Sequence, residues 1–119
     1  MIAPALVALV AFIHLAILAM EMVLWETKAV RAIFGVSPDF AANTRVMAAN
    51  QGLYNGFLAA GLILALWRGV PGQGEELALF ILACVTVAGL YGAATASRRI
   101  LFIQAVPALL ALLAVLTGI

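Results

Sequence analysis

The sequence predicts an all-α integral membrane protein, a four-helix bundle with almost nothing outside the bilayer. The first observation is composition: of 119 residues, 67% are hydrophobic and 9% are charged, and the mean hydropathy is +1.23. Soluble domains are charged at roughly a quarter of their positions, and a water-soluble fold of this length could not bury so much apolar surface. The second observation is that four apolar stretches approach the length of about 20 residues that a membrane-spanning helix needs. These stretches are 2–25, 46–67, 76–97 and 100–117.

Breaker residues separate the four stretches. The segment 69–74 holds Pro71 among glycines and predicts the turn between the second and third spans. Ser97-Arg98-Arg99 predicts the next reversal, because about 40 consecutive apolar residues cannot stay straight in one bilayer. In the first loop, Gly35 is a natural helix stop and Ser37-Pro38-Asp39 a natural helix start. We therefore expect one transmembrane domain over 1–119, with helices at about 2–34, 38–67, 76–97 and 99–118.

The positions of lysine and arginine predict the orientation in the membrane. Five of the six basic residues lie in the first and third loops, and the sixth, Arg68, lies at the second loop. The positive-inside rule then places loops one and three in the cytoplasm and both termini outside. The first apolar run follows no basic segment and is long enough to span, so we interpret it as a retained helix rather than a signal peptide. The expected location is the cell (cytoplasmic) membrane, as in a multi-pass protein of the bacterial inner membrane.

Charge and cysteine content argue against several kinds of partner. The net charge of +1 without a basic patch argues against nucleic-acid binding. The single cysteine, Cys84, cannot form an internal disulfide and has no activating neighbour in sequence. One histidine beside one buried glutamate is too few for a zinc site, which usually needs three or four ligands. We predict no metal and no cofactor.

Polar side chains gather at one predicted depth. In the expected topology, all four helices place them in the cytoplasmic half of the bilayer, whereas the outer half is almost entirely apolar. At about 100° per residue, the polar positions of the first span also share one stripe, and those of the second span share one broader face. The candidate site residues are His14, Glu21, Trp25, Asn50, Gln51, Tyr54, Asn55, Tyr91, Thr95 and Gln104.

Glu21 and His14 are the candidate catalytic residues. A carboxylate in a membrane helix costs roughly 2–3 kcal/mol at mid-depth, so Glu21 is expected to face the bundle interior as a proton-transfer or cation-binding group. The alternative is a glutamate near the interface that pairs with Lys28, Arg98 or an amide. His14 lies two turns away, roughly 10 Å along the helix, so a substrate or water would have to bridge the two. His14 is equally well explained as a hydrogen-bonded core residue.

The other candidates would bind substrate, and each has a structural alternative. Asn50, Gln51 and Asn55 would line a site, or would form interhelical hydrogen bonds worth only about 0.6 kcal/mol each. The aromatic residues Trp25, Tyr54 and Tyr91 could instead anchor helix ends at the interface. Gly52 and Gly56 form a small-xxx-small pattern that permits close helix contact and a homodimer.

Four segments of this sequence carry a family resemblance. They are the first-span segment from His14 to Trp25, the Asn-Gln-Gly-Leu-Tyr-Asn-Gly-Phe block that starts at Asn50, and Tyr91-Gly-Ala-Ala-Thr95 with Gln104-Ala-Val-Pro107-Ala. Together they resemble the domain-of-unknown-function 1304 family over essentially the whole chain. That resemblance implies a small, mostly bacterial, four-helix membrane protein and supplies no activity.

Three functions fit these observations. The first is a polar pocket in the cytoplasmic half of the bundle that binds a small amphipathic molecule, with isomerase-like acid–base chemistry as an extension. Proton transfer fits better than hydrolysis because no nucleophile–base pair is visible. The second is a proton-coupled small-molecule transporter that acts as a dimer through Gly52 and Gly56. The third is a structural or assembly subunit in which the polar residues fix helix packing.

Overall fold

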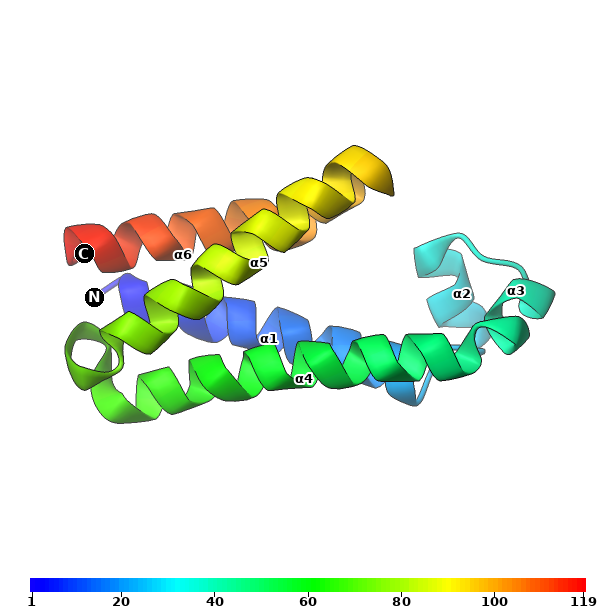
Figure 1. Ribbon diagram of the computed structural model, residues 1–119, viewed down its shortest axis with the longest axis horizontal. Coiled ribbons are helices and arrows are strands. Elements are labelled where there is room, and N and C mark those ends of the chain that lie inside the picture. Colours follow the sequence, from blue (N-terminus) through cyan, green and yellow to red (C-terminus); the bar gives the residue numbers. More distant parts are fainter. The chain divides into compact units, whose positions relative to one another are not determined.

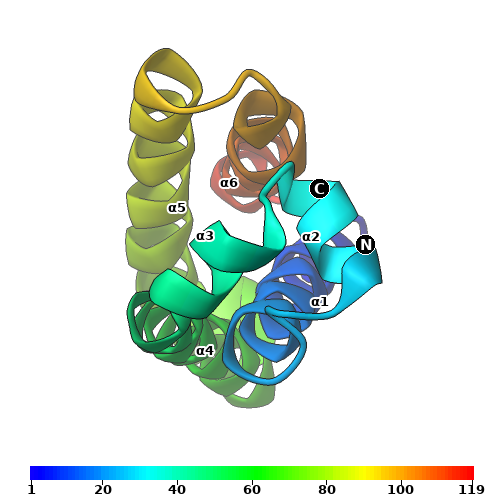
Figure 2. The same ribbon diagram turned by 90° about the vertical axis from the view of Figure 1, so that its right-hand side faces the viewer.

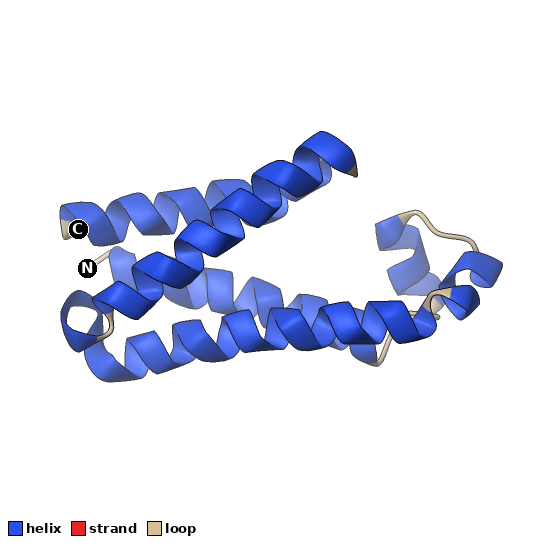
Figure 3. Cartoon of the chain, in the orientation of Figure 1, coloured by secondary structure: helices blue, strands red, loops and turns tan.

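The fold is all-α, as the composition predicts. A computed structural model describes residues 1–119 as six α-helices without strands (Figures 1 and 3). The helices are α1 (Ala3–Met22), α2 (Lys28–Phe34), α3 (Pro38–Asn43), α4 (Arg45–Arg68), α5 (Glu75–Thr95) and α6 (Val106–Thr117). A turn (Gly69–Gln73) follows α4, and a π-helical turn (Leu101–Ala105) precedes α6.

Three of these helices are long and apolar enough to cross a membrane. They are Ala3–Met22, Arg45–Gln73 and Glu75–Thr95, whereas the fourth apolar helix, Leu101–Thr117, is shorter. Their large apolar side chains are not all packed inside: Phe12 is 68% exposed, Phe80 60% and Phe102 69%. Soluble proteins rarely expose large contiguous apolar surfaces, so length, composition and exposure together indicate a membrane protein.

The first loop contains two short helices, where the first and second spanning helices were expected to continue without a break. Helix α1 ends at Met22, and α2 begins at Lys28 after a five-residue turn that places Trp25 inside the fold, so the expected helix 2–34 is divided. Thr27 causes this division, because its Oγ1 donates to Leu24 O (2.7 Å) and accepts from Val30 N (3.4 Å) as the N-cap of α2. The expected helix 38–67 is likewise interrupted at Thr44, between α3 and α4.

The predicted stop and start signals of this loop are confirmed. Gly35 ends α2 with φ of 69°, a left-handed conformation that glycine adopts without a steric penalty. Ser37 caps α3 by accepting a hydrogen bond from Phe40 N (3.1 Å), and Pro38 occupies the first turn.

The chain divides into two compact units, which we describe separately. The first comprises Met1–Ile13 and Leu58–Ile119, and the second comprises His14–Phe57. Helices α1 and α4 each contribute one part to both units. The second unit therefore holds the end of α1, the short helices α2 and α3, and the first half of α4.

Small aliphatic side chains form the core of the first unit. They come from α1, α4, α5 and α6: Ala3, Val7, Val10, Ala11, Leu62, Ala65, Ala78, Leu82, Val85, Ala108, Ala111, Ala114 and Val115. Helix α5 and the π-helical turn before α6 approach so closely that a Cβ on Gly89 would lie 2.7 Å from the backbone nitrogen of Ala105. The chain ends also meet in this unit, where Ile2 N donates to Ile119 O (2.6 Å; Figure 1).

A separate small core holds the second unit together. Trp25, Val30, Ala41 and Ala48 are buried in it, and Met20 and Val36 pack against them. Val30 belongs to α2 and Ala41 to α3, so both short helices contribute to the core that contains Trp25. Figure 2 shows α2 and α3 on the side that faces the viewer. This core lies beside the end of α1 and the first half of α4, which hold the candidate site.

Candidate functional site

Glu21 and Asn55 meet between α1 and α4 in the second unit. Asn55 Nδ2 donates to Glu21 Oε1 (2.8 Å) and also to the backbone oxygen of Gln51 (3.0 Å). Both side chains are half-buried. The last turn of α1 supplies the carboxylate, and the amide lies on the face of α4 that also carries buried Ala48. These contacts bring together two of the predicted site residues.

Two glycines permit this close contact between α1 and α4. A Cβ on Gly52 would lie 2.7 Å from Met22 Cγ, 3.1 Å from Glu21 Cβ and 3.2 Å from Leu18 O. A Cβ on Gly56 would lie 2.5 Å from Leu18 Cδ1. The small-xxx-small pattern therefore serves a seam within the chain, and this seam holds Glu21 within hydrogen-bonding reach of Asn55.

Trp25 lies in the core of the second unit. Its Nε1 donates to Thr44 Oγ1 (3.1 Å), and its ring meets that of Phe34 edge-on, with centroids 5.0 Å apart. Both the ring and the indole N–H of Trp25 therefore make contacts within the protein. Thr44 was not among the sequence candidates, because nothing in the sequence pairs it with a residue 19 positions away.

The polar face of α4 is otherwise open. Asn50 and Gln51 are exposed, and Asn50 Nδ2 donates to Val46 O of its own helix (2.8 Å). Tyr54 is also exposed and meets Phe57 edge-on at a centroid distance of 5.9 Å. These three side chains are open to a ligand, and the hydrogen bond of Asn50 and the ring contact of Tyr54 do not involve Glu21.

His14 is fully buried, with 0% of its side chain exposed. It lies on α1, about two turns before Glu21 and therefore roughly 10 Å away along the axis. The burial agrees with both sequence interpretations, a core residue or a group that a substrate reaches from inside.

The remaining candidates belong to the first unit. Tyr91 is 72% exposed on α5, and Thr95 is exposed and donates from Oγ1 to Tyr91 O (2.7 Å). Gln104 is half-buried in the π-helical turn before Pro107. These three residues therefore belong to a different unit from Glu21 and Asn55.

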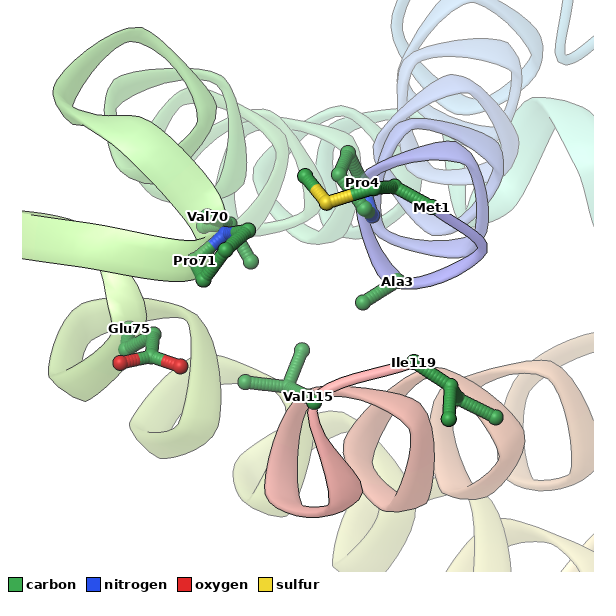
Figure 4. Close-up of a pocket in the computed structure, with 9 residues that line it drawn as sticks. Met1, Ala3, Pro4, Val70, Pro71, Glu75, Val115 and Ile119 are labelled. Atoms are coloured by element: carbon green, nitrogen blue, oxygen red, sulfur yellow. The ribbon is translucent and has the colours of Figure 1, made fainter.

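A crevice opens at the chain ends of the first unit (Figure 4). Its cavity volume is about 10 Å³, far below the roughly 300 Å³ at which small-molecule pockets begin. None of the sequence-predicted site residues lines it. The lining residues are Met1, Ala3, Pro4, Val70, Pro71, Glu75, Val115, Gly118 and Ile119.

The site therefore reduces to one carboxylate held by one amide. Glu21 can accept further hydrogen bonds, bind a cation or exchange a proton. No group of three or more His, Cys, Asp or Glu side chains that could hold a metal ion is present.

The comparisons with known proteins give a family. The family model described as protein of unknown function (DUF1304) matches residues 8–116. Curated proteins and solved structures give no match. The matched range includes Glu21, Asn55 and both glycines of the seam. The chain belongs to the DUF1304 family.

Proposed function

We propose that this protein is a multi-pass membrane protein that binds a small amphipathic molecule at Glu21 and Asn55. One observation carries the proposal: Glu21, a half-buried carboxylate at the end of a candidate membrane helix, accepts a hydrogen bond from the neutral amide of Asn55. Ionisable groups at membrane depth are costly, and a bound ligand would offset that cost.

The proposed arrangement is a single four-span domain with both termini outside and loops one and three in the cytoplasm. Leu101–Thr117 would be the fourth span, at the lower end of the range of about 17–25 residues for spanning helices. The contact between Ile2 and Ile119 supports an even number of crossings, because it requires both chain ends on one side. The distribution of lysine and arginine supports the orientation in the cell membrane.

Acid–base chemistry is the catalytic extension of this proposal. Glu21 would exchange a proton with the substrate, and His14 would take part through the substrate or a water molecule. Asn50, Gln51 and Tyr54 would orient the substrate from the open face of α4.

Native mass spectrometry tests the binding proposal. The protein, purified gently from its membrane, should carry a discrete small-molecule adduct that Glu21→Gln loses. Glutamine keeps an oxygen that accepts from Asn55, so this change removes the charge and retains the hydrogen bond. Glu26→Gln is the matched control, because Glu26 is an exposed glutamate of the same unit. The absence of an adduct from both the wild type and the control would contradict the proposal.

A structural or assembly role is the second candidate, and the glycine seam favours it. Glu21 and Asn55 would then lock α1 against α4 without any ligand. This role predicts that Glu21→Leu lowers thermal stability while the wild type carries no adduct.

Dimeric transport through Gly52 and Gly56 is disfavoured by the same seam. Both glycines already face α1 of their own chain, so a dimer would need another surface or an opened seam. Proton-driven solute flux in proteoliposomes, abolished by Glu21→Gln, would favour transport over the present proposal.

A further inference from the structure

We propose that the ligand of the Glu21–Asn55 pair is a protonated amine with an apolar tail. This inference rests on the proposed binding function and adds the chemical class of the head group. It follows from which hydrogen-bonding positions of the pair are already used, from the charge of the pair and from the side chains around it.

The Glu21–Asn55 pair has free hydrogen-bond acceptors and no free hydrogen-bond donors. The side-chain amide of Asn55 has two N–H groups, and Asn55 Nδ2 makes two hydrogen bonds, to Glu21 Oε1 and to Gln51 O. What remains are acceptor positions, the carbonyl oxygen of Asn55 and the free lone pairs of the Glu21 carboxylate. A ligand that completes this site must therefore donate hydrogen bonds.

The charge of the pair selects a cation. Asn55 is neutral, so its hydrogen bond does not compensate the negative charge that Glu21 has when it is ionised. In a partly buried site of low effective dielectric constant, that charge attracts a cation and repels an anion more strongly than it would in water. Cationic donors to a carboxylate also make shorter and stronger hydrogen bonds than neutral donors do.

The neighbouring side chains select an apolar tail. Leu18 and Met22 flank the pair along the seam, where they contact the positions of Gly52 and Gly56. Met22 remains 42% exposed, so the apolar surface beside the pair is partly open. A single amine with an alkyl chain satisfies both the polar pair and this surface.

A head-group series with one common tail tests this assignment. Binding of dodecylamine, dodecyltrimethylammonium, dodecanol and dodecanoate would be measured by calorimetry on the full chain in lipid nanodiscs, against empty nanodiscs. Dodecylamine should bind most tightly, because it is cationic and donates hydrogen bonds. Dodecyltrimethylammonium should bind more weakly, since it has the charge and no N–H donor, and dodecanoate should be the weakest.

Variants of Glu21 distinguish loss of its charge from loss of the folded structure. Glu21→Gln should weaken dodecylamine binding about tenfold or more, the usual effect of losing a charged hydrogen-bond partner. Glu21→Asp, which keeps the charge, should retain the preference for dodecylamine, and Glu26→Gln should bind as the wild type does. Thermal unfolding of each variant shows whether it is folded.

Each outcome favours or overturns the assignment. Tighter binding of dodecanol or dodecanoate that depends on Glu21 would overturn the amine and leave the binding function intact. Equal binding of the two cations would overturn the hydrogen-bond argument. If no probe binds above the empty nanodiscs and native mass spectra show no adduct, the proposed function fails as well.

Discussion

The two compact units of this chain differ in the interactions that stabilise each of them internally. The first packs alanine, valine and leucine from four helical segments, and its helices approach closely at glycine. The second has an aromatic core and joins distant segments through side-chain hydrogen bonds, Trp25 to Thr44 and Asn55 to Glu21. Close packing of apolar side chains therefore accounts for the first unit, whereas the second unit adds paired polar groups to its own core and glycine seam. Polar groups can also form hydrogen bonds with a ligand, which is why we propose that the binding site lies in the second unit.

Trp25→Ala should have the largest effect and should break the second unit first. It removes the central aromatic side chain of that core, a change that typically costs about 3–5 kcal/mol. Hydrogen–deuterium exchange should rise across residues 14–57 well before it rises across 58–119. Trp25→Phe, which keeps a ring against Phe34, is the matched control and should cost less. A uniform rise over the whole chain would show that the units do not unfold separately.

Gly89→Ala should destabilise the first unit, as Trp25→Ala destabilises the second. The added Cβ would meet Ala105 N, Cα and Cβ at 2.7, 2.9 and 2.9 Å, so backbone must move, at a cost of about 1–3 kcal/mol. Gly92→Ala meets only the side chain of Ile100, at 3.1 Å and beyond, and should cost less. Thermal unfolding in detergent compares the two variants. Equal stabilities would contradict the close contact of α5 with the segment before α6.

Thr44→Val should destabilise the second unit by about 1 kcal/mol. It keeps the shape of the side chain and removes the oxygen that accepts from Trp25 Nε1. Trp67→Phe would leave Trp25 as the only tryptophan, so its fluorescence reports the change. An unchanged spectrum and an unchanged midpoint of unfolding would show that this hydrogen bond does not contribute.

Glu21→Gln should have the smallest effect on stability, within about 0.5 kcal/mol, because the amide oxygen still accepts from Asn55. Glu21→Leu leaves the donor of Asn55 without that acceptor and should cost about 1 kcal/mol or more. Thermal unfolding of the two variants separates hydrogen bonding from charge. A large loss for Glu21→Gln would contradict the expectation that glutamine keeps the hydrogen bond to Asn55.

The sequence predicted the parts of the fold that depend on local chemistry. Gly35 and Ser37 mark helix ends because their effects act within one turn, and both predictions are confirmed. The division of the first expected helix was missed because the apolar residues of α2 continue the periodicity of a helix. Only the capping hydroxyl of Thr27 signals the break.

Contacts between distant segments were less predictable from the sequence. Glu21 was expected to find an amide or a cation, but its choice of Asn55 depends on how closely Gly52 lets α4 approach α1. The pairing of Trp25 with Thr44 depends on the turn after α1 and was not predicted. The predicted site residues on α5 and near α6 lie in the first unit, and their relation to Glu21 remains a prediction.

Photoaffinity labelling in the native membrane tests the central claim, that Glu21 and Asn55 bind a ligand. An alkylamine with a diazirine in its chain would be crosslinked to the wild type, Glu21→Gln and Glu26→Gln, and the labelled peptides would be mapped. We expect labelling within residues 14–57 of the wild type and of Glu26→Gln, and its loss in Glu21→Gln. Labelling that is unchanged in Glu21→Gln, or confined to residues 58–119, would contradict the claim.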